Sequence, residues 1–90
     1  EPWAAALAHA VAAARPGGRV VVVLHARRNL AEGTGGPQDP AVLRDPEHVV
    51  AEAARLPVEV ERDELRERPV AEAPRPALDT LVVLRVVGRA

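Results

Sequence analysis

The stretch ARPGGRVVVVLHARRN, residues 14–29, decides how the rest of this 90-residue chain is interpreted. Pro16 cannot continue a helix, and Gly17 and Gly18 tolerate the positive φ angles of a tight reversal. The run that follows, residues 19–25, is rich in valine and has no polar alternation, which is typical of a strand covered on both faces of a sheet. The stretch therefore predicts a helix end, a turn and a buried strand, followed by a cluster of polar side chains.

Two helices are predicted, one on each side of this strand. The first covers residues 3–14, where the larger apolar side chains recur at helical spacing: Trp3, Leu7 and Val11, followed by Ala14. The second starts at Asp45-Pro46-Glu47, because Asp suits the N-cap, Pro fits the first turn and Glu favours the positive end of the helix dipole. It should end at about Leu56. Residues 25–44 show no period and predict a long loop, of a length often found in binding loops.

Two further strands complete the order α-β-α-β-β. In residues 58–67, valines alternate with charged side chains, which indicates a half-exposed edge strand. Leu65 lies an odd number of positions after Val58 and Val60, so in a regular strand its side chain would point to the opposite face. We therefore expect a bulge between Glu61 and Glu64. The acidic side chains of this segment have no metal-ligand spacing and are expected to discourage strand addition. Residues 80–87 are apolar except for one arginine and predict a second buried strand.

The strand pattern also predicts the topology of the sheet. A proline-rich connection suited to a hairpin joins the last two strands, so the expected order is 19–25, 80–87, 58–67, a three-stranded mixed sheet with the last strand central and antiparallel. Strand 19–25 then keeps an unfilled edge. Right-handed crossovers place both helices on one face of the sheet. The opposite face would meet water, which favours self-association or marginal stability.

Composition excludes several classes of function. The chain is 48% hydrophobic and 28% charged with a formal net charge of −1, as in a single globular domain, and it has no basic excess to bind nucleic acid. It has no cysteine for disulfide or thiolate chemistry. No apolar run approaches the roughly 18 residues of a membrane span, and no basic segment precedes the alanine-rich opening, so we expect a cytoplasmic protein without a membrane partner. The absence of methionine suggests a chain cut from something longer.

Two stretches together resemble a known family. ARPGGRVVVVLH resembles the motif at the fifth strand of class I S-adenosylmethionine-dependent methyltransferases, except that Ala14 stands where a leucine usually precedes the turn. HARRNLAEGTGGPQDPAVLRDPEHVVAE is similar to bacterial members with a Gly-Gly-Pro-Gln-Asp-Pro loop and a Pro-Glu helix start. The likeness covers essentially the whole chain. It implies that residues 1–90 are the C-terminal part of one partial Rossmann-like methyltransferase domain.

The resemblance also says what is missing. The family binds its cofactor mainly through a glycine-rich loop after the first strand and an acidic residue after the second, and neither is present here. The likeness implies an S-adenosylmethionine-dependent enzyme, as part of a longer chain, that methylates oxygen, nitrogen, sulfur or carbon of a small acceptor. No cofactor-binding or metal residue is expected, and these residues alone should be inactive. The alternative is a non-catalytic α/β module that pairs through its open strand edge.

Candidate site residues follow strand 19–25, because ligands of open α/β sheets bind beyond the carboxyl ends of the strands. His25 could orient or deprotonate the methyl acceptor, or it could be a hydrogen-bonded structural residue. Arg27 and Arg28 could clamp an anionic substrate or remain solvated.

Three polar residues further along the loop leave a similar choice. Asn29, Gln38 and Asp39 could line a pocket or fold the loop onto itself through local hydrogen bonds. The glycines between them lack the fingerprint of a phosphate cradle and predict only a flexible loop. His9 and His48 are expected to be exposed.

Overall fold

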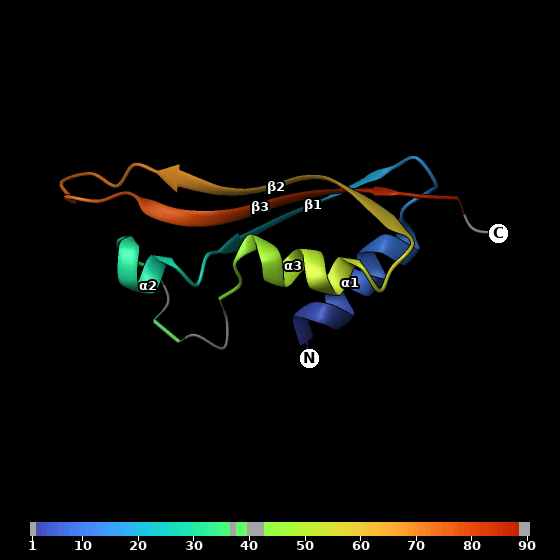
Figure 1. Ribbon diagram of the computed structural model, residues 1–90, viewed down its shortest axis with the longest axis horizontal. Coiled ribbons are helices and arrows are strands. Elements are labelled where there is room, and N and C mark those ends of the chain that lie inside the picture. Colours follow the sequence, from blue (N-terminus) through green and yellow to red (C-terminus); the bar gives the residue numbers. More distant parts are fainter. Residues whose placement is uncertain (1, 37, 40–42, 89–90) are drawn as a thin grey trace.

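The computed structural model describes residues 2–36, 38–39 and 43–88. The helices and strands follow one another as α1 (Pro2–Ala13), β1 (Arg19–His25), α2 (Asn29–Glu32), α3 (Pro46–Ala53), β2 (Val58–Arg68) and β3 (Ala77–Val86). Figure 1 shows two layers, a long three-stranded sheet and the helices against one of its faces. The expected α/β class is confirmed.

The sheet has the order β1-β3-β2, with β3 in the centre and antiparallel to both neighbours. The predicted strand order is thus confirmed, but the description of the sheet as mixed is wrong. A hairpin joins β2 to β3, and β3 then runs against β1 as well. The outer strands β1 and β2 are parallel to each other but are not paired. Both pairs of strands in the described part of the chain are therefore antiparallel.

β2 has the predicted bulge, but at Glu61 itself, between Val60 and Arg62, and not between Glu61 and Glu64 as expected. Val60 pairs with Leu84, whereas the next paired residue, Arg62, faces Val83. Glu61 is therefore an extra residue in β2. Beyond the bulge Leu65 faces Thr80, which is fully buried on the helix side of β3. The bulge thus turns Leu65 to the same face of the sheet as Val60, which an odd spacing of five residues would not allow in a regular strand.

The hydrophobic core lies between the sheet and the helices α1 and α3. Both helices contribute to one cluster with β3, which confirms that they cover the same face; its buried members are Leu7, Val11, Val49, Ala53, Val82, Leu84 and Val86. Trp3 packs against this cluster, as expected of an anchor of the first helix. The Arg44 guanidinium lies 5.3 Å from the centre of the Trp3 ring, within range of a cation–π interaction.

The other face of the sheet, here called the open face, has no helix over it among the described residues (Figure 1). Val21 and Val23 of β1 point to this face and are 60% and 63% exposed. Their partners on β3 are Val83 and Leu81, so four apolar side chains form one patch. The outer edge of β1 has no partner strand within the described part of the chain. The open edge was predicted from the count of buried strands, and the uncovered face from the handedness of the crossovers.

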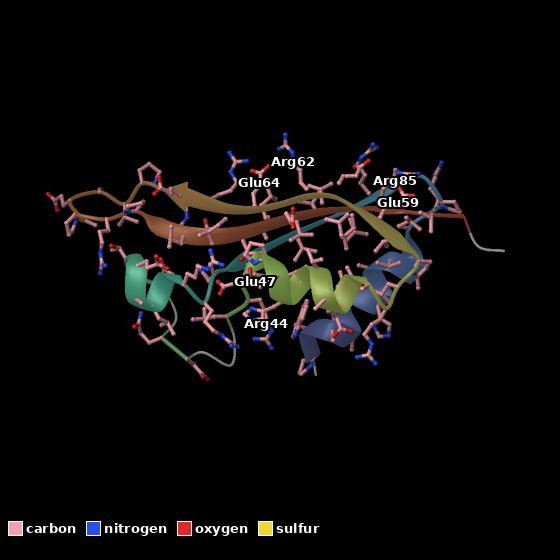
Figure 2. All side chains as sticks on the ribbon, viewed as in Figure 1. Arg44, Glu47, Glu59, Arg62, Glu64 and Arg85 are labelled. Carbon is pink, nitrogen blue, oxygen red and sulfur yellow. The ribbon has the colours of Figure 1, made fainter. Side chains whose placement is uncertain are left out.

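Ion pairs between strands flank this apolar patch. Arg19 of β1 donates to Glu61 of β2 at 2.6 Å, and this hydrogen bond lowers the pKa of the Glu61 carboxyl. Arg85 pairs with Glu59 at the same end of the sheet, and Figure 2 shows their side chains on the face away from the helices. The open face is therefore apolar in the middle and charged at the end where β1 begins.

Some boundaries differ from the prediction. α3 ends at Ala53, three residues early, and β3 begins at Ala77, before its apolar run. The segment 25–44, expected to be a loop without structure, contains the single-turn helix α2. One turn is too short to show a helical period in the sequence. No helix in the described part of the chain is long and apolar enough to cross a membrane.

Candidate functional site

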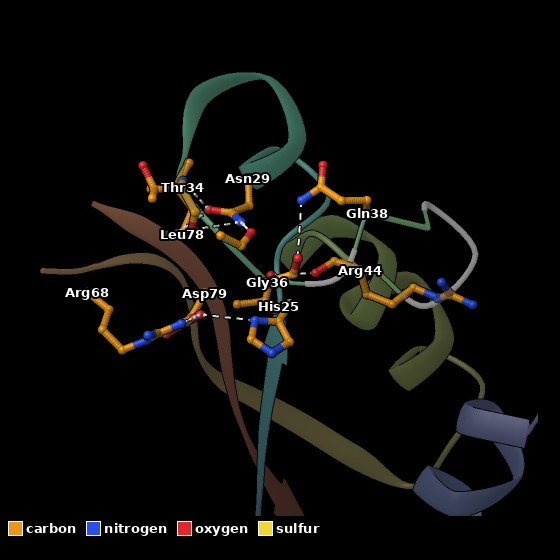
Figure 3. Close-up of polar contacts among 11 residues, drawn as sticks. His25, Asn29, Thr34, Gly36, Gln38, Arg44, Arg68, Leu78 and Asp79 are labelled. Atoms are coloured by element: carbon orange, nitrogen blue, oxygen red, sulfur yellow. Dashed lines mark hydrogen bonds and ion pairs between the residues drawn. The ribbon is translucent and has the colours of Figure 1, made fainter. Parts of the chain in front are cut away.

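The candidate residues lie at the carboxyl end of β1, where the chain turns into α2 and the glycine-rich loop (Figure 3). His25 is the last residue of β1 and Asn29 the first of α2. Arg27 and Arg28 form the turn between them, and Gln38 and Asp39 lie further along the loop. The structure brings His25, Asn29 and Gln38 close to the same loop, and it directs the two arginines elsewhere.

Asn29 is a buried clamp for the loop, with 4% of its surface exposed. Its Oδ1 accepts hydrogen bonds from the backbone amides of Leu78 (2.8 Å) and Thr34 (3.2 Å). Its Nδ2 donates to the carbonyl of Gly35 at 2.8 Å. These contacts fold the loop onto itself, the second of the two roles considered for Asn29, and also attach it to β3.

The loop glycines are required by this clamp. A Cβ atom at Gly33 would lie 1.8 Å from Asn29 Oδ1, which no packed structure accommodates. Gly36 has a φ of +73° and lies against the His25 ring, so that an added Cβ would be 3.5 Å from Nδ1. Gln38 Nε2 donates to the Gly36 carbonyl at 3.1 Å. The glycines thus shape a turn beside His25 that the Asn29 side chain holds through hydrogen bonds.

His25 faces a carboxylate that the sequence alone did not indicate. Its Nδ1 lies 3.8 Å from Asp79 Oδ1, and 44% of the imidazole side chain is exposed. Arg68 holds the same carboxylate through Nε (2.9 Å) and Nη2 (3.4 Å), and the hydrogen bond raises the pKa of the Arg68 guanidinium. Figure 3 shows the three side chains in line. The signal that could have found Asp79 is the register between β1 and β3, which places it directly opposite His25.

Arg28 connects the end of β1 to the start of α3. Its backbone amide donates to Asp45 Oδ1 at 2.9 Å, and its Nη2 donates to Glu47 Oε1 at 3.1 Å. Glu47 also accepts a hydrogen bond from its own backbone amide, which lowers the pKa of its carboxyl, and Arg28 lowers that pKa further. Arg28 is therefore engaged within the chain, unlike a substrate clamp.

His48 differs from its prediction. It is half-buried, and its Nδ1 accepts a hydrogen bond from the backbone amide of Asp45 at 2.8 Å. Asp45 is the N-cap of α3, as its position before Pro46 predicted. The short distance from His48 back to the N-cap amide explains why this imidazole is not exposed. His9 lies on the exposed side of α1, as expected.

Two shallow depressions separate the remaining candidates. One, of about 470 Å³, is lined by Val23, Leu24, His25, Arg68 and Asp79. The other, of about 310 Å³, is lined by Trp3, Arg27, Arg44, His48, Ala51 and Glu52 on the helix side. His25 and Arg27 therefore do not share one pocket. Asp39 is exposed.

No protein-family model, curated protein or solved structure significantly matches the chain. Within residues 2–36, 38–39 and 43–88, no group of three histidine or acidic side chains is arranged to hold a metal ion.

Proposed function

We propose that this chain is the C-terminal, substrate-side portion of a bacterial class I S-adenosylmethionine-dependent methyltransferase that acts on a small acceptor in the cytoplasm. The strand order supports the proposal most directly. The last strand, β3, lies between β1 and β2 and runs against both, with α1 and α3 on one face. The resemblance of the Arg-Pro-Gly-Gly turn and the Gly-Gly-Pro-Gln-Asp-Pro loop to this family implies the same arrangement.

The open edge of β1 gives the proposal a physical basis. A strand with the sequence RVVVVLH suits a position inside a sheet, yet among the described residues it pairs on one side only. In the proposed enzyme, β1 pairs with a strand of the missing N-terminal half, which also supplies the glycine-rich cofactor loop. This chain then contributes walls of the acceptor site from the end of β1 and the loop after it.

The first test is cofactor binding. We expect the 90-residue chain to show no binding of S-adenosylmethionine in titration calorimetry, because it lacks the glycine-rich loop that the resemblance assigns to the cofactor. A chain extended upstream by about a hundred residues, roughly the size of half an α/β domain, should bind it and methylate a small acceptor.

The matched comparison is between these two chains under the same conditions. Micromolar binding of the cofactor to the 90-residue chain would contradict the half-domain assignment. An upstream segment without a strand followed by Gly-x-Gly-x-Gly would favour the alternative function.

The alternative is a non-catalytic module that pairs through the β1 edge, and one observation favours it. Val21 and Val23 are exposed on a strand that has no charge between Arg19 and His25. The opposite edge strand, β2, alternates charged side chains and has a bulge, two features that hinder strand addition. Of the two edges that the described sheet has, the β1 edge lacks both features.

Self-association through β1 can be measured directly. We expect the 90-residue chain to form dimers or larger species as its concentration rises in sedimentation velocity experiments, because the apolar patch and the strand edge adjoin. The double substitution Val21→Lys and Val23→Lys should reduce association, since lysine on an edge strand opposes pairing. Val60→Lys is the control, because Val60 is 39% exposed but lies on β2 and points to the helix face, away from the open face. A monomer at every concentration would contradict this expectation.

A further inference from the structure

We propose that His25, Asp79 and Arg68 form a proton relay in which Asp79 fixes the tautomer of His25, so that Nε2 acts as a base toward an acceptor that must lose a proton. The inference rests on the proposed function and narrows its acceptor to a group that loses a proton on methylation, such as a hydroxyl or an amine. It assigns a positioning role to Asp79, which follows His25 by 54 residues in the sequence.

The three side chains come from three different strands of the sheet. His25 ends β1, Asp79 lies opposite it on β3, and Arg68 ends β2. The carboxylate is held at both oxygens by Arg68, with Oδ2 at 2.9 Å and Oδ1 at 3.4 Å. Oδ1 is also the oxygen that lies 3.8 Å from His25 Nδ1. The sheet therefore fixes the carboxylate, and the carboxylate faces one particular nitrogen of the imidazole.

The loop confines the imidazole from a second side. Gly36 lies against the ring, and its neighbour Gly35 is held by the Asn29 side chain. Gln38 donates to the Gly36 carbonyl and strengthens the same turn. The buried Asn29 clamp thus acts on His25 through the loop, without touching the ring in any hydrogen bond of the structure's described part. Figure 3 shows this succession from Asn29 to Gly36 to His25 to Asp79.

The geometry selects a tautomer. In a neutral imidazole one nitrogen is a donor and the other an acceptor. A carboxylate attracts the N–H of Nδ1 and repels its lone pair, so Asp79 favours the form with the proton on Nδ1. Nε2 then has a lone pair, and an open depression lined by Val23 and Leu24 adjoins the ring. A small acceptor can approach His25 there.

The chemistry balances with this assignment. The methyl group leaves the sulfonium sulfur for an acceptor oxygen or nitrogen, and the electrons of the broken C–S bond stay on sulfur. The proton of the acceptor moves to Nε2. The positive charge of the sulfonium thus becomes that of an imidazolium beside Asp79, which later returns the proton to water. A thioether acceptor has no proton to lose and gains nothing from such a base.

The test uses the 90-residue chain without cofactor. Long-range ¹H–¹⁵N spectra of its three imidazoles at about pH 8.5, where an ordinary histidine is neutral, report the position of each ring proton. We expect His25 with the proton on Nδ1. His48 is an internal control of opposite sign, because its Nδ1 accepts from the Asp45 amide and its proton must be on Nε2. His9 is exposed and supplies the unconstrained reference.

Two substitutions separate the relay from general stability. Asp79→Ala should move His25 to the tautomer mixture of His9 and leave His48 unchanged. Glu59→Ala, which removes an ion pair with Arg85 at the other end of the same sheet, should change neither. The relay would be overturned if the tautomer of His25 in the wild-type chain already matched that of His9 or His48. It would also be overturned if Asp79→Ala left the tautomer of His25 unchanged.

The enzymatic arm uses the chain extended upstream. His25→Gln should lower kcat for a hydroxyl or amine acceptor by roughly 10²–10⁴-fold, the usual contribution of a general base, with little change in cofactor affinity. Asp79→Ala should lower kcat in the same direction, and Asp79→Glu should restore part of it. An extended chain without methyl transfer would remove the proposed function but leave the tautomer result, whereas a His25 without a fixed tautomer would remove the relay alone.

Discussion

Leu84→Ala should lower the free energy of unfolding of this chain by about 2–5 kcal/mol, the cost of removing a buried leucine and leaving a cavity. Leu84 lies in the central strand with no exposed surface, between α1, α3 and both outer strands. A domain of this length buries a smaller fraction of its surface than a larger domain does, and the described residues cover one face of the sheet with helices. Native domains have only about 5–15 kcal/mol in total, so a large share of the stability is removed.

Leu81→Ala is the matched control for this prediction. Leu81 is the same residue type three positions earlier on β3, but it lies half-buried on the open face, opposite Val23. Its truncation should cost much less. Urea denaturation followed by circular dichroism measures both losses, at a protein concentration low enough to keep the chain monomeric. Equal losses would show that the open face is covered after all.

Asn29→Ala should be the most damaging change outside the hydrophobic core. It leaves the amide of Leu78 and the carbonyl of Gly35 without their partner, together with the amide of Thr34. A single buried backbone group that loses its hydrogen bond costs roughly 1–3 kcal/mol. We expect a loss of at least about 2 kcal/mol in the free energy of unfolding, because three groups are affected. Faster hydrogen exchange at the Leu78 amide should accompany it.

Two comparisons make the Asn29 prediction specific. Asn29→Asp keeps the oxygen that accepts from Leu78 and Thr34 but removes the donor to Gly35, so it should be less destabilising than alanine. Gln38→Ala removes one exposed hydrogen bond of the same loop and should change the stability little. If Asn29→Ala unfolds like Gln38→Ala, the clamp does not hold the loop.

The strand order of the sheet could be predicted from the sequence, because the hydrophobic pattern of each strand shows whether it is central or at an edge. Two apolar runs and one alternating run allow few arrangements of three strands, and the odd spacing of Leu65 from Val60 requires a bulge. The structure confirms the order β1-β3-β2 and the presence of a bulge, which lies at Glu61. Crossover handedness then fixes the face on which the helices lie. These inferences use periodicity, which is visible in a single sequence.

The polar contacts of the site could not be predicted, because they join segments that are distant along the chain. Asn29 accepts from the amide of Leu78, and the Thr80 hydroxyl donates to the carbonyl of Arg44 at 2.6 Å. Asp79 lies in the part of β3 that precedes the predicted run 80–87, and its polar partner Arg68 replaces apolar packing there. The interpretation of His48 failed for a similar reason, because its partner is a backbone amide.

The position of β3 also has a consequence for how the chain acquires its structure as it is made. Both ladders of the sheet include β3, which follows every other strand of the chain. While a ribosome is still extending the chain toward residue 77, β1 and β2 lack the strand that pairs with both of them among the described residues, and the helices lack the part of their core that β3 supplies. Sheet, core and the row of His25, Asp79 and Arg68 must then assemble together, in one late step whose long loop closures favour slow folding. Until that step the valine run of β1 is exposed, so synthesis rather than the mature state is when this sequence is most exposed to aggregation.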